Sequence, residues 1–482
     1  MSPLSLVLVA IVMVGALAPL VGAWQYLLVG LHALRNHLRL ASPYLPRTVV
    51  VIPAWNEQAV IGASIDRLLG MDYPPERLRI VVVDDASTDG TPDAIGERAR
   101  MHPGQVVHVR TASGGKGKAH ALNQGLEQVL ADDWAEAILI ADADVQFEPG
   151  TLRRMTRHLA DPGVGAVTAY IKEGTHGPGY LNRFIGFEYV TAQAAARRTQ
   201  NVLGGMACLA GGAQLHSRTS LEAIGGRIDT STLAEDTVAT FETQLSGRRA
   251  IFEPHAVVWA EEPDDLEGLW KQRLRWSRGN LQVTRRYMDV WFRPFRGHGL
   301  GGITFGLAWF TVLLQPMSMI TASGALLMLL LLGDAQAWAA FHVLWIINAV
   351  CYLFTTAFSF AIDPRVARIS WREGILFPGI VSVAIIGYAC LPEAFGSSSG
   401  PPAPLIEWFL CIWLAGCMGV AWLALRVEHA RGGKRLSRVL LYIAGYGAFL
   451  CLVTLTAYIR ELRGAEQRWD KTEKRGRALL TP

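Results

Sequence analysis

Two patterns of hydrophobic residues divide this chain. Between about residues 47 and 300, short apolar runs alternate with mixed segments, whereas residues 301–460 form long apolar runs with almost no acidic residues. The first pattern predicts an α/β domain, because the buried strands of a parallel sheet are short and continuously apolar. The second pattern predicts membrane-spanning helices, since about 20 apolar residues cross the hydrocarbon core of a bilayer.

Three of the short runs predict strands of a doubly wound parallel sheet, because helical stretches separate them. They cover residues 48–53, 79–83 and 137–141. The second run ends in Asp84 and Asp85, and the third continues into Asp142 and Asp144. Ligands of such sheets bind beyond the carboxyl ends of the strands, so the acidic residues predict a binding site at that edge.

The long runs predict one span before the domain and five after it. They lie at about residues 4–30, 303–332, 337–361, 374–393, 405–427 and 437–459. The first has no cleavage site and is followed by arginines, which indicates a retained helix with the domain on the cytoplasmic side. Five later spans would leave the C-terminus outside, whereas its basic tail favours the inside. Either the run with Pro316 forms a hairpin or one later run does not cross.

Composition narrows the class of partner. The 482 residues carry a net charge of +4, which is too mild to favour nucleic acid. The basic residues cluster beside the apolar runs, and this placement favours a membrane surface. Six cysteines form no C-x-x-C pair, and five of them lie in the apolar half, so we expect buried thiols and no metal or redox site.

The acidic strand ends suggest nucleotide chemistry. Asp142 and Asp144 are spaced to bind a divalent cation, which would in turn hold a diphosphate. Asp84 and Asp85 offer acceptors for ring N–H and ribose hydroxyl groups. The stretch that follows is rich in turn and cap residues, so a helix N-cap at Thr88 or Asp89 is an alternative that does not exclude binding.

A glycine-rich basic stretch at 114–118 is suited to phosphate contact, with a solvated loop as the alternative. It is not a P-loop, because Ala112 stands where the motif requires glycine and no Ser or Thr follows Lys118. His120 likewise excludes the dinucleotide pattern.

The segment 232–279 holds two further motifs. A carboxylate of Glu235 or Asp236 near an acceptor hydroxyl would act as a general base, although a surface helix start is the alternative. The sequence Gln-Arg-Leu-Arg-Trp at 272–276 combines arginine for a departing diphosphate with tryptophan for a sugar face. An interfacial belt is the alternative for this second motif, since Arg and Trp favour that region.

In this order, the motifs resemble those of the membrane-embedded family 2 glycosyltransferases. This family includes cellulose, chitin-oligosaccharide, hyaluronan and poly-N-acetylglucosamine synthases. The resemblance covers roughly residues 47–300. It implies a GT-A fold, a UDP-sugar donor, Mg²⁺ or Mn²⁺, and inversion at the anomeric carbon. Family members often have Thr before the Glu-Asp pair, whereas Ala234 stands there in this chain.

The resemblance also implies roles for single residues. Asp236 would be the general base beside Glu235, Asp142 and Asp144 would hold the metal, and Asp84 or Asp85 would bind uridine. Pro53, Glu57 and Lys118 would lie near the donor together with Asp142. The acceptor and diphosphate side would be lined by Gln272, Arg273, Arg275 and Trp276.

We therefore expect an inverting transferase in the bacterial inner membrane that extends a β-linked polysaccharide processively and passes it through the spans. The alternative is transfer of one sugar to a membrane lipid, as in ceramide glucosyltransferases. A third reading, an inactive transporter or scaffold, predicts the loss of an acidic motif, and all of them are intact. Expected partners are the donor, the acceptor and membrane lipids, with no nucleic acid; an accessory membrane subunit is left open.

The expected organisation has five parts. They are an N-terminal transmembrane helix with its juxtamembrane segment (1–46), a cytoplasmic GT-A domain (47–264), amphipathic interface helices with the 272–276 motif (265–300), C-terminal transmembrane helices (301–460) and a basic tail (461–482).

Overall fold

The computed structural model describes residues 2–35, 43–115, 117–175, 177–294, 298–391, 404–430 and 432–467. The chain divides into two compact units, each described by itself below. We call residues 28–264, 282–306 and 466–482 the sheet unit, and residues 1–27, 265–281 and 307–465 the helical unit. Most of the predicted basic tail (468–482) lies outside the described residues, as do Arg39 and Lys116.

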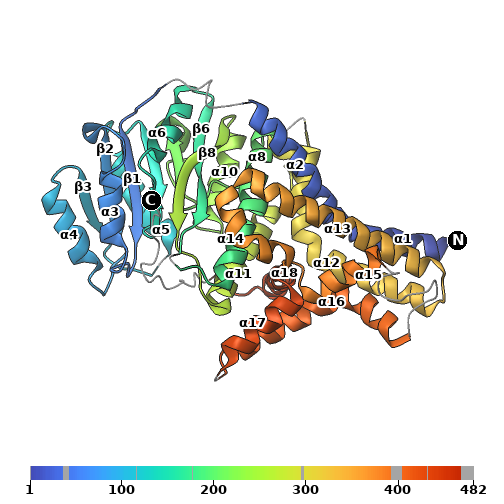
Figure 1. Ribbon diagram of the computed structural model, residues 1–482. Helices are drawn as coiled ribbons and strands as arrows, with labels where there is room; N and C mark the ends of the chain where they lie inside the picture. The colour runs from blue at the N-terminus through green and yellow to red at the C-terminus, as the bar shows by residue number, and fades with distance from the viewer. Residues whose placement is uncertain are drawn as a thin grey trace. The chain divides into compact units, whose positions relative to one another are not determined.

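An eight-stranded sheet in the order β3-β2-β1-β4-β7-β6-β8-β5 forms the centre of the sheet unit (Figure 1). The strands are β1 (Thr48–Ala54), β2 (Leu78–Asp84), β3 (Val106–Arg110), β4 (Ala137–Ala141), β5 (Val145–Phe147), β6 (Val164–Glu173), β7 (Ala213–Ser217) and β8 (Arg249–Ala260). The three predicted strands are confirmed, and β1 pairs in parallel with both β2 and β4.

The sheet is mixed, however, and not parallel throughout as predicted. β7 runs antiparallel to β4 and β6, and β5 runs antiparallel to β8. Only residues 142–144 separate β4 from β5 along the chain, yet β5 pairs with β8 and not with β4.

Helices cover both faces of this sheet, which explains why its strands are continuously apolar. Val50 of β1 packs in one core with Ile65 of α3, while its neighbour Val51 packs in the other core with Leu122 of α5. The helices of the unit are α3 (Ile61–Leu69), α4 (Thr91–Met101), α5 (Lys118–Leu130), α6 (Thr151–Thr156), α7 (Tyr180–Glu188), α8 (Ala195–Leu203), α9 (Arg218–Ala223) and α10 (Glu235–Leu245).

Helices make up the helical unit, most of them apolar, and three of them (α2, α11 and α12) also contain residues of the sheet unit. They are α1 (Pro3–Val14), α2 (Leu17–Arg35), α11 (Leu266–Arg286), α12 (Ile303–Leu331), α13 (Gln336–Ile362), α14 (Pro364–Ile375), α15 (Ile380–Cys390), α16 (Pro404–Val427), α17 (Gly433–Ala444) and α18 (Tyr446–Leu462).

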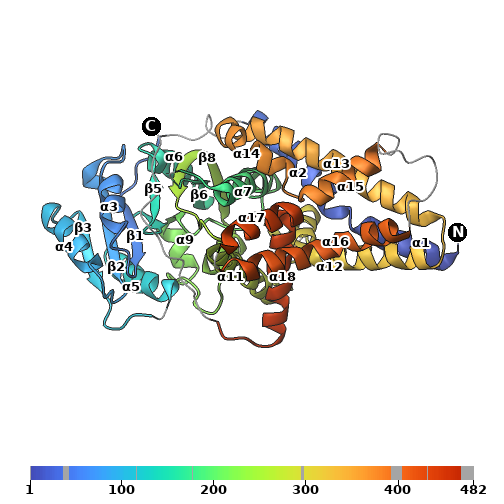
Figure 2. The same ribbon diagram turned by 60° about the horizontal axis from the view of Figure 1, so that its bottom comes forward.

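Within the described part of the chain, four helices are long and apolar enough to cross a membrane, or up to six if each bent pair counts as one span. The bent pairs are α14–α15, which turns by 75°, and α17–α18, which turns by 94° (Figure 2). The predicted hairpin at Pro316 is wrong, because α12 continues through that residue. The later runs are interrupted instead at Pro378-Gly379 and at Gly445, and the first run divides into α1 and α2.

Candidate active site

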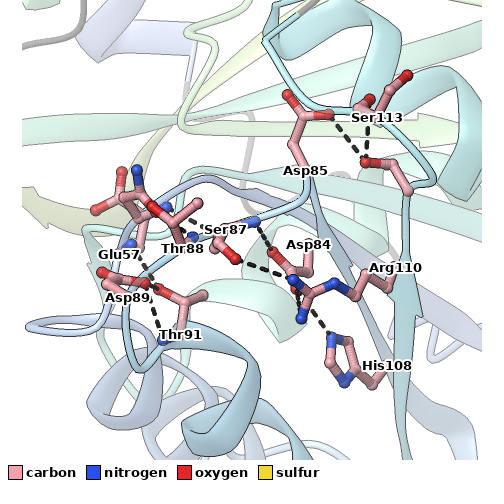
Figure 3. Close-up of polar contacts among 12 residues, drawn as sticks. Glu57, Asp84, Asp85, Ser87, Thr88, Asp89, Thr91, His108, Arg110 and Ser113 are labelled. Carbon is pink, nitrogen blue, oxygen red and sulfur yellow. Dashed lines mark hydrogen bonds and ion pairs between the residues drawn. The ribbon is translucent and has the colours of Figure 1, made fainter.

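The loops after β1 and β2 are joined by hydrogen bonds (Figure 3). The Asn56 N–H donates to Ser87 Oγ at 2.9 Å, and the Thr88 N–H donates to Asn56 Oδ1 at 2.8 Å. The Glu57 N–H donates to Thr91 Oγ1 at 2.8 Å. In the β1–β2 ladder, Pro53 pairs with Val83, which is one residue before Asp84. Pro53, Glu57 and Asp84 are thus brought to one edge of the sheet.

Asp84 is a buried carboxylate with partners from its own chain. Its Oδ1 accepts the Ser87 N–H at 2.8 Å, while its Oδ2 lies 3.4 Å from Arg110 Nη1 and 3.5 Å from His108 Nε2. Arg110 also donates to the Ser87 carbonyl at 3.0 Å. Figure 3 shows these side chains converging beneath the loop. Asp84 therefore fixes the shape of the loop that follows β2.

Asp85 turns towards the glycine-rich stretch. Its two carboxylate oxygens accept from Thr111 Oγ1 at 3.2 Å and from the Gly115 N–H at 3.1 Å. A Cβ on Gly114 would stand 2.2 Å from the Asp85 carbonyl oxygen, so only glycine fits at that position. The glycine-rich stretch is thus folded directly against Asp85.

Asp89 also stabilises the start of the next helix, α4, through a hydrogen bond. Its Oδ1 accepts the N–H of Thr91, the first residue of α4, at 3.0 Å, and its Oδ2 accepts the Gln58 N–H at 3.2 Å. Burial opposes ionisation, but the hydrogen bonds from Thr91 and Gln58 outweigh it and lower the pKa of Asp89. The predicted N-cap at Thr88 or Asp89 is wrong, because Gly90 is the N-cap residue of α4, and Asp89 stabilises the helix start from one position earlier.

A second group of charged residues, which we call the lysine cluster, consists of Lys118, Asp142, Glu235 and Asp236. Lys118 Nζ lies 2.6 Å from Asp142 Oδ1 and 3.6 Å from Glu235 Oε1, and it donates to the Gly211 carbonyl at 3.3 Å. Lys118 is the first residue of α5 and Glu235 the first of α10, so helix starts and a strand end supply the cluster.

The strand register explains why glycines line this cluster. Ala141 pairs with Ala213 in the antiparallel β4–β7 ladder, which brings Asp142 beside Gly212. A Cβ on Gly212 would lie 3.3 Å from Asp142 Oδ2, and one on Gly211 would lie 3.1 Å from both Asp236 Oδ2 and Lys118 Nζ. Side chains at these two positions would crowd the charged atoms.

The electrostatics of the lysine cluster are unbalanced in favour of negative charge. Burial alone would lower the pKa of Lys118, but the charges of Asp142, Glu235 and Asp236 raise it well above its usual range. Burial raises the pKa of Asp142, Lys118 opposes this, and the nearby Asp144 adds to it. One ammonium group thus faces several carboxylates, an arrangement that attracts further positive charge.

Asp142 and Asp144 occupy the link between β4 and β5. The Ala143 carbonyl between them accepts a hydrogen bond from Ser64 Oγ of α3 at 2.6 Å, which fixes the link. Their oxygen donors suit Mg²⁺ or Mn²⁺. No group of three or more His, Cys, Asp or Glu side chains that could hold a metal occurs in the described residues. The residues fit a cation whose remaining ligands come from a bound diphosphate and water.

Sequence reasoning missed residues 206–210, which lead to Gly211 beside Lys118. The Leu209 N–H donates to Thr240 Oγ1 at 2.8 Å and the Ala210 N–H donates to Thr168 Oγ1 at 3.0 Å. Burial, followed by the charge of Asp236, raises the pKa of the Cys208 thiol. Cys208 was predicted as a buried thiol only, because nothing in the sequence reveals that it lies near Asp236.

The 272–276 motif lies on α11, in residues that belong to the helical unit, whereas the lysine cluster belongs to the sheet unit. Gln272 and Arg273 are buried, and Arg273 Nη1 donates to Gln272 Oε1 at 2.7 Å. The Arg273 guanidinium stacks 4.1 Å from the centre of the Trp276 ring. The motif is thus preorganised on the surface of one helix.

Two other helices of the helical unit anchor α11. At its start, the Leu266 N–H donates to Glu428 Oε2 at 3.1 Å, just beyond the end of α16. Further along, Arg278 Nε lies 2.5 Å from Glu461 Oε1 of α18, and Arg278 Nη2 donates to the Ala465 carbonyl at 2.7 Å. The motif therefore lies between two points at which α11 is fixed.

These features define the class of protein. Residues 46–279 match the family described as "Glycosyltransferase like family 2", and the segment belongs to that family. A solved mannosyltransferase from Pyrobaculum calidifontis shares the fold, with a TM-score of 0.51 and 24% identity over 80% of this chain and 100% of its own. The sheet unit is therefore a GT-A-like domain, and long apolar helices follow it.

Three curated relatives are similar to about half of this chain. A probable glycosyltransferase of Bacillus subtilis is 32% identical over 52% of this chain and 59% of its own length. The β-monoglucosyldiacylglycerol synthase of Synechocystis is 31% identical over 52% of this chain and 50% of its own length. The poly-β-1,6-N-acetyl-D-glucosamine synthase of Staphylococcus epidermidis is 27% identical over 50% of this chain and 56% of its own length. The match thus spans between half and three fifths of each relative.

Proposed function

We propose that the protein is an inverting glycosyltransferase that transfers sugar from a UDP-sugar to an acceptor at a membrane. The lysine cluster carries this proposal, because it places an ammonium group and a pair of carboxylates beside Asp142 at the carboxyl end of the sheet. Such a site can hold a negatively charged diphosphate on one side and deprotonate a hydroxyl on the other.

Asp236 is the general base of the proposed reaction. It takes the proton of the acceptor hydroxyl while the hydroxyl oxygen forms a bond to the anomeric carbon. The bond from that carbon to the UDP oxygen breaks at the same time, and UDP leaves with the electron pair. Attack from the side opposite UDP inverts the anomeric carbon. Glu235, 3.6 Å from Lys118 Nζ, orients the ammonium group towards the leaving diphosphate.

On the donor side we assign different tasks to neighbouring residues. Asp84 is enclosed by Ser87, His108 and Arg110, so we assign it to shaping the loop. Asp85 is the residue that we assign to uridine, because each carboxylate oxygen has a second lone pair beyond the bond that it already accepts. Pro53 and Glu57 flank the nucleotide on the β1 side.

Asp142 and Asp144 would hold Mg²⁺ or Mn²⁺. The cation would neutralise charge on the diphosphate as UDP departs. We further assign Gln272, Arg273, Arg275 and Trp276 to the acceptor and the diphosphate. Stacking on Trp276 holds Arg273 in one orientation, which suits a planar guanidinium that donates hydrogen bonds to phosphate oxygens.

For the acceptor, we propose a growing β-linked polysaccharide, extended processively from the cytoplasmic face of the inner membrane and passed through the apolar helices. The similarity to the poly-β-1,6-N-acetyl-D-glucosamine synthase supports this choice. The similarity to the β-monoglucosyldiacylglycerol synthase supports a second candidate, the transfer of a single sugar to a membrane lipid.

The test uses purified full-length protein in lipid nanodiscs. UDP release is measured with UDP-N-acetylglucosamine, UDP-glucose, UDP-N-acetylgalactosamine and UDP-glucuronic acid, each with Mg²⁺ or Mn²⁺. We expect release with one donor, and the labelled product is then sized. A ladder supports the polysaccharide synthase and a single organic-soluble product supports the lipid acceptor. Folded protein that releases UDP from no donor, even with added glycan and lipid acceptors, would contradict the proposal.

A further inference from the structure

The first helix of each bent pair, α14 in one and α17 in the other, exposes a similar surface. On α14, the exposed residues include Arg365, Arg368 and Arg372, together with the apolar side chains of Ile369 and Trp371. The acidic residue of this helix, Glu373, is 2% exposed. The uncovered face of α14 therefore combines positive charge with large apolar groups and displays no acid.

The exposed face of α17 has the same composition. It carries Lys434, Arg435 and Arg438, and between them Leu436 and Val439, which are both 52% exposed. No acidic residue occurs in this helix. Both helices bury a narrow stripe that consists mostly of small residues, with Glu373 in the stripe of α14, so the basic face is the one that the protein leaves uncovered.

The two helices are held together as one structure. The Tyr442 hydroxyl of α17 donates to Glu373 Oε1 of α14 at 3.0 Å. At the breaks, a Cβ on Gly379 would lie 2.4 Å from the Ile443 carbonyl oxygen, and one on Gly445 would lie 2.3 Å from the Pro378 carbonyl carbon. Both glycines have positive φ, at +93° and +94°, which L side chains rarely adopt. The breaks thus cross in direct backbone contact.

The bends determine how such a structure meets a bilayer. α14 turns into α15 by 75°, and α17 turns into α18 by 94°. Where α15 and α18 run along the bilayer normal, α14 and α17 lie close to the plane of the membrane. Arginine and lysine interleaved with Trp, Ile, Leu and Val suit the headgroup layer, where apolar atoms enter the acyl region and charged ends reach phosphates.

We propose that the exposed faces of α14 and α17 form one binding surface for the headgroups of anionic phospholipids. We call it the basic helix pair, and it consists of Arg365, Arg368, Arg372, Lys434, Arg435 and Arg438. Charge complementarity selects anionic over zwitterionic lipids, because the six cations are exposed on two helices whose one acidic residue, Glu373, is buried. This surface is independent of the proposed transfer site.

The experiment measures lipid association by electron spin resonance. Full-length protein is reconstituted in phosphatidylcholine that contains trace spin-labelled phosphatidylglycerol or trace spin-labelled phosphatidylcholine, and the motionally restricted fraction gives a relative association constant. We expect a preference for phosphatidylglycerol that falls with added salt. Arg365, Arg368 and Arg372 changed together to Gln should reduce this preference about tenfold, since each surface cation contributes about fivefold before screening.

Matched variants separate charge from folding. Changing the same three arginines to Lys keeps the charge and should keep the preference. Arg67, Arg100 and Arg227 of the sheet unit, changed together to Gln, remove equal charge elsewhere and should leave the preference unchanged. Equal association of both lipids with the wild-type protein, or an unchanged preference in the Gln variant of α14, would overturn the proposal.

Discussion

The two acidic clusters of the sheet unit differ in how their charges are compensated. Asp84 is completely buried, but Ser87, His108 and Arg110 of the same edge surround it. Asp142 belongs instead to a cluster in which Lys118 serves several carboxylates. A carboxylate whose partners all come from the fold shapes the structure. A group of carboxylates with one cation among them is poised for a ligand that brings positive charge.

The largest expected effect tests whether Asp142, in contrast to Asp84, is a metal ligand. Asp142→Asn removes the carboxylate that we assign to Mg²⁺ or Mn²⁺, and UDP release should fall by about a hundredfold or more. Titration of UDP affinity against Mn²⁺ should show that the metal no longer strengthens binding. The exposed Asp72, paired with Arg153 at 2.8 Å, supplies the control Asp72→Asn, which should behave as wild type. Retained metal dependence in Asp142→Asn would contradict the assignment.

The pH dependence of metal binding sharpens this prediction. Burial raises the pKa of Asp142, and a metal ligand must be deprotonated. Affinity for Mn²⁺ should therefore weaken as the pH falls, beginning at a higher pH than for an aspartate with the ordinary pKa of 3.8. Calorimetric titration at several pH values measures the effect. An affinity that stays constant down to the ordinary value would argue against a ligand role for Asp142.

For Asp84, the comparison predicts that a substitution lowers the stability of the sheet unit. Asp84→Asn weakens the ion pair with Arg110 and the hydrogen bond from the Ser87 N–H, at a cost of about 1–3 kcal/mol. The Tm of the sheet unit should fall accordingly. Arg110→Gln should give a similar loss, and the double variant should lose less than the sum, because the two residues interact. Strict additivity would show that Asp84 is not held through Arg110.

A smaller effect tests the anchoring of α11. Glu461→Gln removes a charged partner of Arg278, which is 5% exposed, and we expect a loss of about 1–3 kcal/mol with a reduced rate of transfer. The exposed pair Lys271–Glu267 on the same helix is the matched control, and Glu267→Gln should change stability by less than about 0.5 kcal/mol. Thermal unfolding and UDP release measure both variants. Equal effects of the two substitutions would contradict the anchoring role.

A pH-dependent effect on stability is expected from Glu173 at the end of β6. Burial, with a contribution from Glu262, raises its pKa from 4.5 to about 7. Between these values the unfolded chain releases a proton that the folded chain retains, so stability falls as the pH rises through this window. Glu173→Gln removes the titrating group, and its Tm should decline less over the same interval. Parallel Tm profiles for variant and wild type would show that Glu173 does not titrate there.

The fold was predictable wherever local pattern determines structure. The apolar runs at 48–53, 79–83 and 137–141 correspond to β1, β2 and β4, because a strand that is buried on both faces has a continuous run of apolar residues. β7 and β5 could not be placed, since their pairing with β4 and β8 depends on contacts between distant residues. The helix breaks were missed because their glycines are required by a crossing of two remote segments.

The site was predictable in part for a similar reason. Strand ends and motif spacing pointed to Asp84, Asp142 and Asp236 as candidates. The sequence did not distinguish Asp84 from Asp85, because the enclosure of Asp84 by His108 and Arg110 comes from the β2–β3 pairing. Cys208 and the rest of residues 206–210 were missed because only the folded chain brings them to α10.

The most direct test of the account compares donor binding and transfer in the wild-type protein and in Asp236→Asn. The account predicts that the variant binds the UDP-sugar with Mn²⁺ as the wild type does, while transfer to acceptor falls by about 10²–10⁴-fold, the usual contribution of a general base. Transfer by Asp236→Asn at the wild-type rate would show that another group accepts the proton and that the lysine cluster is not the site of transfer.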